Sequence, residues 1–228
     1  MKKEQARSQG SKIRRQLSIS DRRRKDGAIC HQLIDVDLAR LLEEFRIERE
    51  ETEKLKKNQS VNDKFLQDAL ERMYGVQPVR DPYIAVYSPI EGEVDITPFI
   101  TAAREAGCII CYPAMLQENL MCMVRFDIND PYINEFEFLK NPQKVTKLDV
   151  RKTSCRMVSP EDLDIILVPM LAFNNDRFFI SRGGAIYDRY IPRTSLGVRV
   201  IGVGYSEQCI DDLEISSHDC QLRKTVTA

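Results

Sequence analysis

The chain has 228 residues, 43% of them hydrophobic, so it can bury a full core as one domain or as one domain with an appendage. Its 34 Lys and Arg residues balance 35 Asp and Glu residues, which excludes a surface that coats a polyanion such as nucleic acid. The N-terminus is basic and lacks an apolar h-region, and no segment is long enough to span a bilayer. We therefore expect a cytoplasmic protein without a membrane partner.

The first 45 residues predict two helices. Ser18 is a typical N-cap for the second helix, and an apolar stripe follows it at helical spacing. We expect this stripe to lie in the core; its members are Ile29, Leu33, Val36, Leu41, Leu42 and Phe45.

Residues 43–57 hold eleven charged side chains of both signs in fifteen positions, which predicts a solvated helix face. Gly75 and Pro78 then break the pattern before the first predicted strand. We interpret residues 46–80 as a helical insertion in a single domain that covers 1–228.

From Tyr83 the pattern alternates between strands and helices. We predict strands at 83–87, 108–112, 121–126, 164–168 and 198–204, and a helix at 97–106. Pro113 should end the second strand, and residues 127–160 are polar and irregular. The predicted fold class is α/β, with an open, mostly parallel sheet, flanking helices and a long helical N-terminal region.

Ligands of open α/β sheets bind beyond the carboxyl ends of the strands. Four segments follow predicted strands in this way and should lie near one another: residues 88–95, 113–117, 169–188 and 205–208.

The seven cysteines, an odd number spread over apolar segments, indicate reduced thiols used as small hydrophobic residues. Cys108 and Cys111 have redox-motif spacing, but positions three apart in a strand face opposite sides, so their sulfurs should diverge. His31 and His218 are too far apart in sequence for a local zinc pair.

A Gly-rich turn, Ser181-Arg182-Gly183-Gly184, leads into a predicted helix that starts at Ala185. Glycines let backbone N–H groups approach an anion, and an arginine adds a forked contact, so this pattern is typical of a phosphate cradle. Asp188, one helical turn later, could hold Mg²⁺ against the same phosphates. The alternative is that the glycines only turn the chain.

Three further sites each allow two interpretations. Glu93 and Asp95 form either a helix cap cluster ahead of Thr97 or part of a binding site. Tyr187 either stacks on a ligand ring or packs under the loop. Asp219, next to His218, is better interpreted as a metal-site carboxylate than as half of an acid/base dyad, since no activated nucleophile accompanies the pair.

Several of these motifs occur in the order found in one family. Residues 164–189, Gly92-Glu93-Val94-Asp95, Gln208 and Ser217-His218-Asp219 together resemble the 5-formyltetrahydrofolate cyclo-ligase (methenyltetrahydrofolate synthetase) family. The resemblance covers nearly the whole chain apart from residues 46–80. Lys3 and Arg7 match the family's N-terminal Lys-x-x-x-Arg, although by themselves they would be interpreted as solvated surface charge.

The resemblance implies an ATP- and Mg²⁺-dependent ligase. ATP would phosphorylate the formyl oxygen of 5-formyltetrahydrofolate, N10 would attack the activated carbon, and loss of phosphate would give 5,10-methenyltetrahydrofolate. The rate would come from in-line alignment and from cations around the transferred phosphoryl group.

Residue roles follow from the same resemblance. Lys3, Arg7 and Arg182 would contact ATP phosphates, and Gly183 and Gly184 would supply backbone donors. Asp188 and Asp219 would ligate Mg²⁺, and Glu93 would bind the pterin. Arg182 and Asp188 would be the catalytic residues, while Tyr187 would contact ATP and the folate substrate.

This chain departs from the family in the loop itself. The family typically has Phe-Asp, a Gly, and then Arg-Leu-Gly-Arg-Gly-x-Gly-Tyr-Tyr-Asp, and six positions differ here: Asn174, Arg177, Phe179, Ser181, Ala185 and Ile186. Phe179 removes a positive charge, which Arg177 is placed to restore. Side chains at 181 and 185 should penalise a positive φ or close nucleotide approach.

Two hypotheses about function follow. The first is an active folate cyclo-ligase with a divergent loop, and the second is a non-catalytic relative that binds a folate, a nucleotide or a protein partner. A ligase acting on another formylated, pterin-like substrate lies between them.

Overall fold

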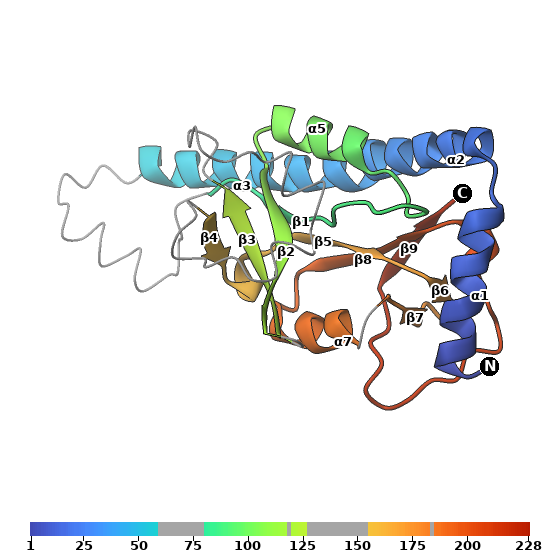
Figure 1. Cartoon of the computed structure of the whole chain (residues 1–228). Helices are drawn as coiled ribbons and strands as arrows, with labels where there is room; N and C mark the ends of the chain where they lie inside the picture. Colours follow the sequence, from blue (N-terminus) through green and yellow to red (C-terminus); the bar gives the residue numbers. More distant parts are fainter. Residues whose placement is uncertain (59–79, 118–119, 127–154, 183–184) are drawn as a thin grey trace.

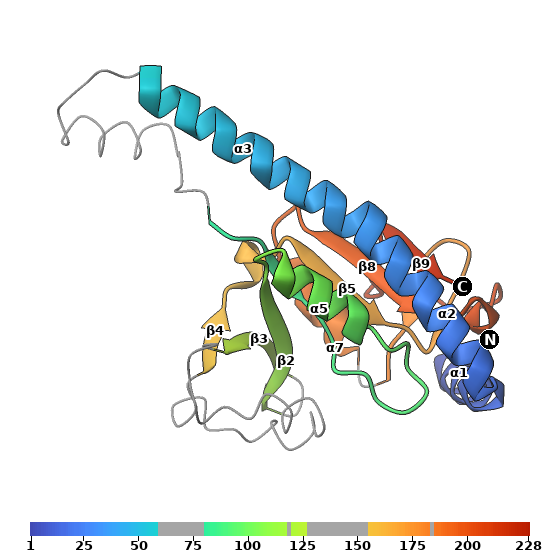
Figure 2. The ribbon, with the colours of Figure 1, turned by 90° about the horizontal axis from the view of Figure 1, so that it is seen from above.

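The structure is a computed structural model that describes residues 1–58, 80–117, 120–126, 155–182 and 185–228. Its N-terminal region forms two helical pieces, as predicted. Helix α1 (Lys3–Gln16) ends before Ser18, whose Oγ accepts a hydrogen bond from the Asp21 N–H at 3.0 Å and caps α2 (Ile19–Gln32). Helix α2 continues through a π-helical turn, η1 (Leu33–Leu38), into α3 (Ala39–Asn58), and this long rod extends past the sheet (Figure 2).

The π-helical turn changes which residues of the rod face the core. Ile29, Leu33 and Leu41 are buried as predicted, but Val36 is 51% exposed, so its assignment to the core was wrong. Asp37 takes the inward position instead, where the Lys224 Nζ donates to both carboxylate oxygens at 2.8 Å. The wider turn and this ion pair together rotate Val36 toward solvent.

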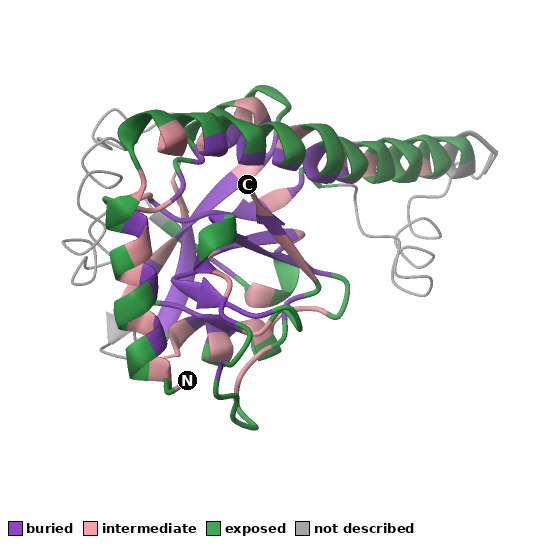
Figure 3. Cartoon of the chain, turned by 90° about the vertical axis from the view of Figure 1, so that its right-hand side faces the viewer, coloured by how far each residue is buried: buried purple, intermediate pink, exposed green. Residues whose placement is uncertain are grey.

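Beyond the sheet, α3 is almost wholly exposed, which confirms the predicted solvated face (Figure 3). Arg46 pairs with Glu43 at 2.6 Å and with Glu50, one helical turn away on either side. Residues 46–58 continue α3 without a break, whereas 59–79 lie outside the described residues. The interpretation of 46–80 as an insertion in a single domain stays a prediction.

A seven-stranded sheet forms the centre of the molecule, in the order β4-β3-β2-β1-β5-β8-β9. Strands β1, β2, β5, β8 and β9 run parallel to one another, while β3 and β4 add an antiparallel edge beside β2. This arrangement confirms the predicted fold class. The strands are β1 (Tyr83–Ala85), β2 (Ile109–Gln117), β3 (Leu120–Phe126), β4 (Cys155–Val158), β5 (Ile165–Pro169), β8 (Arg199–Gly204) and β9 (Lys224–Thr227).

The sheet differs from the sequence-based prediction in three places. Strand β2 passes through Pro113, which pairs with Met123 of β3, so the predicted stop was wrong. The proline is tolerated because β1 pairs only with residues 109–111, and Pro113 lies beyond that parallel partner. Strand β4 falls in the segment expected to be irregular, of which 127–154 lie outside the described residues, and β9 was not predicted.

Helices cover both faces of the sheet (Figure 1). The α2–α3 rod and α5 (Thr97–Glu105) pack on one face, and α7 (Ile186–Tyr190) packs on the other. Buried strand residues alternate between these two cores: Ile165 and Leu167 face one, Ile166 and Val168 the other.

Cys108 and Cys111 follow the same division, so their sulfurs diverge as predicted. Burial raises the pKa of Cys108 to about 11 and that of Cys111 to about 12, which keeps both thiols protonated at neutral pH.

A short hairpin of β6 (Ala172–Phe173) and β7 (Phe179–Ile180) lies beyond the end of β5, beside α1 (Figure 1). Three 3-10 turns complete the described elements: η3 (Pro160–Asp162), η4 (Ile191–Arg193) and η5 (Ser206–Gln208). Among the described helices, none combines the length and apolar character that crossing a bilayer requires.

Candidate active site

Helix α1 lies across the carboxyl-terminal side of the sheet and presents one face to it. Ala6, Gly10 and Arg14, spaced four residues apart, are its buried members. Gly10 packs on the backbone of the β5–β6 connection so closely that a Cβ there would lie 2.0 Å from the Leu171 carbonyl oxygen. Only glycine allows this approach, which brings the side chains of α1 to the strand ends.

At the N-terminal end of α1, three predicted site residues meet. The Lys3 Nζ donates to Asp219 Oδ1 and, at 3.0 Å, to the Ser216 hydroxyl. Asp188 Oδ1 accepts the Cys220 N–H at 2.9 Å, which ties α7 to the same C-terminal segment. The structure thus gathers Lys3, Asp188 and Asp219 from three distant parts of the chain.

The two carboxylates affect each other's charge. Burial raises the pKa of Asp188, and the nearby Asp219 raises it further. Burial would also raise the pKa of Asp219, but hydrogen bonds from Lys3 and Ser216 hold it below its ordinary value. Asp219 is therefore the better anion, and Asp188 is the group that a further cation would stabilise.

This pair fits the predicted Mg²⁺ site in its donor chemistry. Mg²⁺ is commonly held by one or two carboxylates together with substrate phosphates. Within the described part of the chain, no group of three or more His, Cys, Asp or Glu side chains could hold a metal by itself. Asp188 and Asp219 would then be completed by phosphate oxygens, while Lys3 adds a fixed positive charge beside them.

At the other end of the buried face of α1, Arg14 pairs with Glu93 at 3.5 Å, and each side chain is 7% exposed. Arg14 also donates to the Met170 carbonyl oxygen, and Glu93 Oε2 accepts the Ile90 N–H at 3.3 Å. Burial raises the pKa of Glu93, against the opposing effects of Arg14 and Arg182. Glu93, the residue predicted to bind the pterin, thus lies next to the buried guanidinium group of Arg14, which no sequence pattern had singled out.

Of the two acidic residues, only Asp95 bonds to the start of α5, and it lies one residue before the N-cap, Ile96, which has no side-chain cap bond. Asp95 Oδ1 accepts hydrogen bonds from the Thr97 N–H at 3.0 Å and from the Thr97 hydroxyl at 2.6 Å, at the start of α5. Glu93 makes no such bond and turns toward Arg14 instead. Glu93 and Asp95, two residues apart in the sequence, therefore have different surroundings.

Arg7 and Arg182 lie near the Gly-rich turn. The Arg7 Nε donates to the Ser181 carbonyl oxygen at 3.5 Å, and Arg182 is exposed while still close enough to affect Glu93. Gly183 and Gly184 lie outside the described residues. Tyr187 is 8% exposed and packs in the core, so any contact of its ring with ATP or folate stays a prediction.

Comparison with known proteins shows the family of the chain. The model of the 5-formyltetrahydrofolate cyclo-ligase family matches residues 40–228. The chain belongs to this family. Among named relatives, the 5-formyltetrahydrofolate cyclo-ligase of Escherichia coli K12 is 26% identical over 166 residues, which cover 71% of this chain and 86% of the relative. The cyclo-ligase of Mycoplasma pneumoniae is 25% identical over 126 residues, 55% of this chain and 60% of the relative.

Two solved structures share the fold. One is a 5,10-methenyltetrahydrofolate synthetase from Mycoplasma pneumoniae, with a TM-score of 0.60 and 19% identity over 99% of this chain and 98% of the other. The second, from Aquifex aeolicus, has a TM-score of 0.60 and 21% identity over 99% of this chain and 89% of the other. The family model begins at residue 40, whereas this likeness in fold includes α1.

The departures from the cyclo-ligase loop have structural consequences. Arg177 and Ala185 have φ values of +66° and +54°, and they are the two non-glycine residues with positive φ in the described ranges. At 177 the family has glycine, and at 185 it has Gly-Tyr in place of Ala185-Ile186, so a side chain now occupies a left-handed backbone position. Ala185 thus has the positive φ for which a side-chain penalty was expected, whereas Ser181 does not.

The other departures are accommodated by packing. Phe179 is 2% exposed in the core under α7, where half-buried Ile186 also packs. The Asn174 Oδ1 accepts the Phe178 N–H at 2.9 Å and closes the β6–β7 turn. Arg177 is exposed in that turn, and its carbonyl oxygen accepts the Leu222 N–H at 3.0 Å. The hairpin is therefore held by local bonds and apolar contacts.

Two other candidates have structural partners. Gln208 is fully buried, and its Nε2 donates to the Met170 and Leu171 carbonyl oxygens at 2.7 Å, which fixes the β5–β6 connection. His218 is exposed and contacts the Ser217 hydroxyl, while Asp219 turns to Lys3. Adjacent His218 and Asp219 thus diverge, as expected for a pair that is not a dyad.

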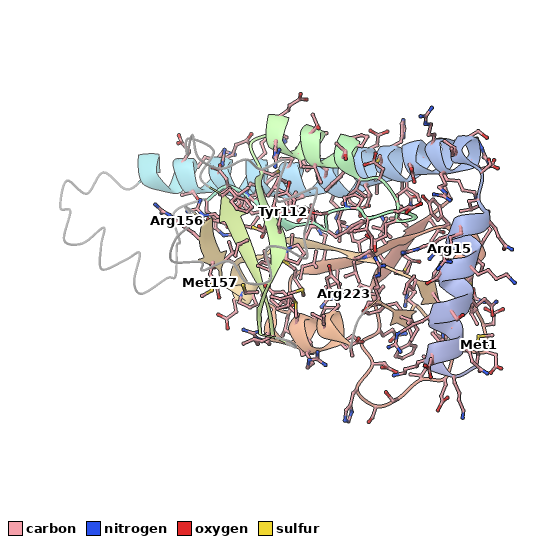
Figure 4. All side chains as sticks on the ribbon, in the orientation of Figure 1. Met1, Arg15, Tyr112, Arg156, Met157 and Arg223 are labelled. Atoms are coloured by element: carbon pink, nitrogen blue, oxygen red, sulfur yellow. The ribbon has the colours of Figure 1, made fainter. Side chains whose placement is uncertain are left out.

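The sequence did not point to a basic cavity of about 380 Å³ beside the Arg14–Glu93 pair. Four arginines contribute to its wall, together with the loop after β1 and the start of the β5–β6 connection. Figure 4 shows Arg15, one of the four, on α1 above the strand ends. A signal was present in the sequence as three arginines, Arg14, Arg15 and Arg22, close to the junction of the two predicted helices. The lining residues are Ser11, Arg14, Arg15, Arg22, Ile90, Glu91, Gly92, Leu171 and Arg182.

Proposed function

We propose that this chain catalyses the ATP- and Mg²⁺-dependent conversion of 5-formyltetrahydrofolate to 5,10-methenyltetrahydrofolate, with release of ADP and phosphate. Membership of the cyclo-ligase family supports the reaction class. The observation that carries the proposal is the meeting of Lys3, Asp188 and Asp219 at one end of α1. At the other end of this helix, Glu93 pairs with Arg14. A cation suited to phosphate and two carboxylates suited to Mg²⁺ thus lie near a carboxylate suited to a pterin.

In this proposal the phosphate end of the site uses the basic residues of α1 and the loop. Lys3, Arg7 and Arg182 would bind and orient the phosphates of ATP, because an amide oxygen is a poor nucleophile and needs in-line alignment. Asp188 and Asp219 would hold Mg²⁺, which would supply further neutralisation of the phosphate charge when bound.

The folate end would use Glu93. The donor-rich edge of a pterin suits a carboxylate acceptor, and Arg14 favours the ionised form of Glu93 against the effect of burial. Tyr87 and Tyr187 are buried close to Glu93. Glu93 would therefore orient the formylated ring toward the phosphate end without itself taking part in bond formation.

The direct test is turnover. Pure protein, 5-formyltetrahydrofolate and Mg-ATP should give the near-ultraviolet absorbance of the methenyl product, with one phosphate released per product. Leaving out ATP, or removing Mg²⁺ with a chelator, should abolish both signals. Folded protein that binds both substrates without forming product would reject the catalytic proposal.

A second candidate is a non-catalytic folate- or nucleotide-binding relative. The specific observation in its favour is the loop, where Phe179 is buried in place of a positive charge and two side chains occupy positive-φ positions. Binding without turnover would support it. A ligase for another formylated, pterin-like substrate would instead release phosphate only with that substrate.

A cytoplasmic location of the protein stays a prediction.

A further inference from the structure

The wall of the arginine-lined cavity includes the exposed Arg15 and Arg182 and also Arg14, the buried partner of Glu93. Its volume of about 380 Å³ falls in the range of small-molecule pockets. Arg14, 7% exposed, is part of its wall, and the Arg14 Nε is buried without a hydrogen-bond partner among the described residues. The rest of the Arg14 guanidinium group is paired with Glu93 and the Met170 carbonyl oxygen, so the other arginines of the wall are the groups that suit an anionic ligand.

The charge of the cavity wall is strongly positive. Four arginines face one lining carboxylate, Glu91, and subtracting Glu93 as well still leaves two positive charges in excess. Among the described residues, neither Arg15 nor Arg182 forms a salt bridge. The Arg22 Nε donates to the Leu17 carbonyl oxygen at 3.2 Å, which leaves its other guanidinium donors for a ligand.

The position of the cavity separates it from the proposed phosphate site. Arg7 and Arg14 are seven residues apart, which corresponds to about 10 Å along a helix. Lys3, Asp188 and Asp219 do not line the cavity. Only Arg182 belongs both to the cavity wall and to the residues proposed to bind phosphate.

A folate carries negative charge at one end only. Its pterin presents donors, which suit Glu93, whereas its glutamate carries two carboxylates, which Glu93 would repel. Guanidinium groups bind carboxylates through two parallel hydrogen bonds, so paired carboxylates suit an arginine-rich wall. Ile90 and Leu171 add apolar surface to the cavity wall.

From these observations we infer that the cavity is a carboxylate subsite, in which Arg15 and Arg22 bind the glutamate of the folate substrate while Glu93 holds the pterin. This inference rests on the proposed function. It gives α1 two binding roles. The first turns of the helix bind phosphate, and its last turn binds the glutamate carboxylates of the substrate.

Binding, measured without turnover, tests the subsite. Calorimetric titration with 5-formyltetrahydrofolate and with 5-formyltetrahydropteroate, which lacks the glutamate, gives one Kd each. The unchanged protein should bind the folate at least about tenfold more tightly. The variants Arg15→Gln and Arg15→Gln/Arg22→Gln should lose most of that difference, with the Kd for the pteroate and the Kd for ATP unchanged.

Arg24→Gln is the matched control, because Arg24 is an exposed arginine of α2 outside the cavity, and it should keep the full difference. Equal folate binding by the control and the Arg15 and Arg22 variants would overturn the inference. A loss of ATP affinity in those variants would also overturn it, in favour of a phosphate site. Failure of the unchanged protein to bind folate would reject the proposed function together with the subsite.

Discussion

Arg14 and Glu93 form an ion pair at 3.5 Å between α1 and the loop after β1, with each side chain 7% exposed. Burial lowers the pKa of Arg14 and raises that of Glu93, so each charge depends on the other. The pair joins the N-terminal helix to the strand ends at the centre of the proposed site.

Removing one partner of the Arg14–Glu93 pair should lower the free energy of unfolding more than removing both partners. Arg14→Met leaves a buried carboxylate unpaired, and the free energy of unfolding should fall by about 3–5 kcal/mol at neutral pH. Because the folded-state pKa of Glu93 is raised, protonated Glu93 favours folding in acid, and this contribution is lost as pH rises through that pKa. The deficit of Arg14→Met should therefore be smaller at pH 5 than at pH 8, by urea denaturation.

The neighbouring substitution Arg15→Met, at an exposed position, serves as the control and should change stability little. Adding Glu93→Gln to Arg14→Met should restore part of the loss. A deficit that is the same at both pH values would mean that Arg14 acts through packing and not through charge.

Lys3 has a structural role besides its proposed contact with phosphate. Its ion pair depresses the pKa of Asp219, so the resulting stability is present above the ordinary pKa of about 3.9 and is lost as pH falls through the folded-state value. Lys3→Ala should thus lower the melting temperature at pH 7, with a smaller effect in acid. Arg7→Ala should weaken ATP binding with little change in melting temperature, and an equal loss of stability in both variants would contradict this difference.

Gly10 and Gly27 form a matched pair of helical glycines. A Cβ at 10 would collide with the Leu171 carbonyl oxygen, whereas a Cβ at 27 would meet nothing within 4 Å. Gly10→Ala should displace α1, lower the melting temperature and weaken ATP binding. Gly27→Ala should stabilise the protein by about 1 kcal/mol, from helix propensity. Unchanged ATP affinity in Gly10→Ala would show that nucleotide binding does not need the close packing of α1.

The two positive-φ side chains in the loop predict stabilising substitutions. Arg177→Gly and Ala185→Gly should each raise the free energy of unfolding by about 0.5–1 kcal/mol, because glycine adopts a left-handed conformation without steric cost. Ala106→Gly, at an exposed residue with φ of −80°, should not stabilise the protein. Chemical denaturation of the three variants decides the matter: equal changes would remove backbone strain as the cause.

Asp188→Asn tests the metal site without removing a hydrogen-bond acceptor. Burial and Asp219 disfavour the charge of Asp188, so the ligand-free variant should be as stable as the unchanged protein at pH 7, or more stable. Its ATP binding should no longer tighten when Mg²⁺ is added, and turnover should be largely lost. Calorimetry with and without Mg²⁺ measures this, and undiminished tightening would place the metal elsewhere.

Local patterns predicted the parallel sheet and most of its helices, because buried strands and amphipathic helices carry their signal in a few consecutive residues. Strand β9 was missed since its four residues, Lys224–Thr227, include one apolar side chain, Val226, and only pairing with β8 defines them. The β6–β7 hairpin is likewise made by tertiary contacts. Val36 failed because a π-helical turn changes the helical phase, and neighbouring hydrophobicity does not reveal such a turn.

For the site, family resemblance identified Lys3, Glu93, Asp188 and Asp219, which the structure places along one side of α1. The role of Arg14 could not be predicted from its neighbours, because it depends on Glu93 and Met170, 79 and 156 positions away. Asp95 was predictable because its partner Thr97 is two residues away. Contacts between residues close in the sequence could be predicted here, and contacts between distant residues could not.

The contact of Lys3 with Asp219 spans 216 residues, and Arg7 reaches Ser181 across 174. During synthesis α1 emerges well before these partners, and contacts that close such long loops form late in folding. The core of the sheet can assemble before the phosphate end of the site exists. If this end of the site binds ATP as proposed, a chain that stops short of Asp219 should retain no nucleotide.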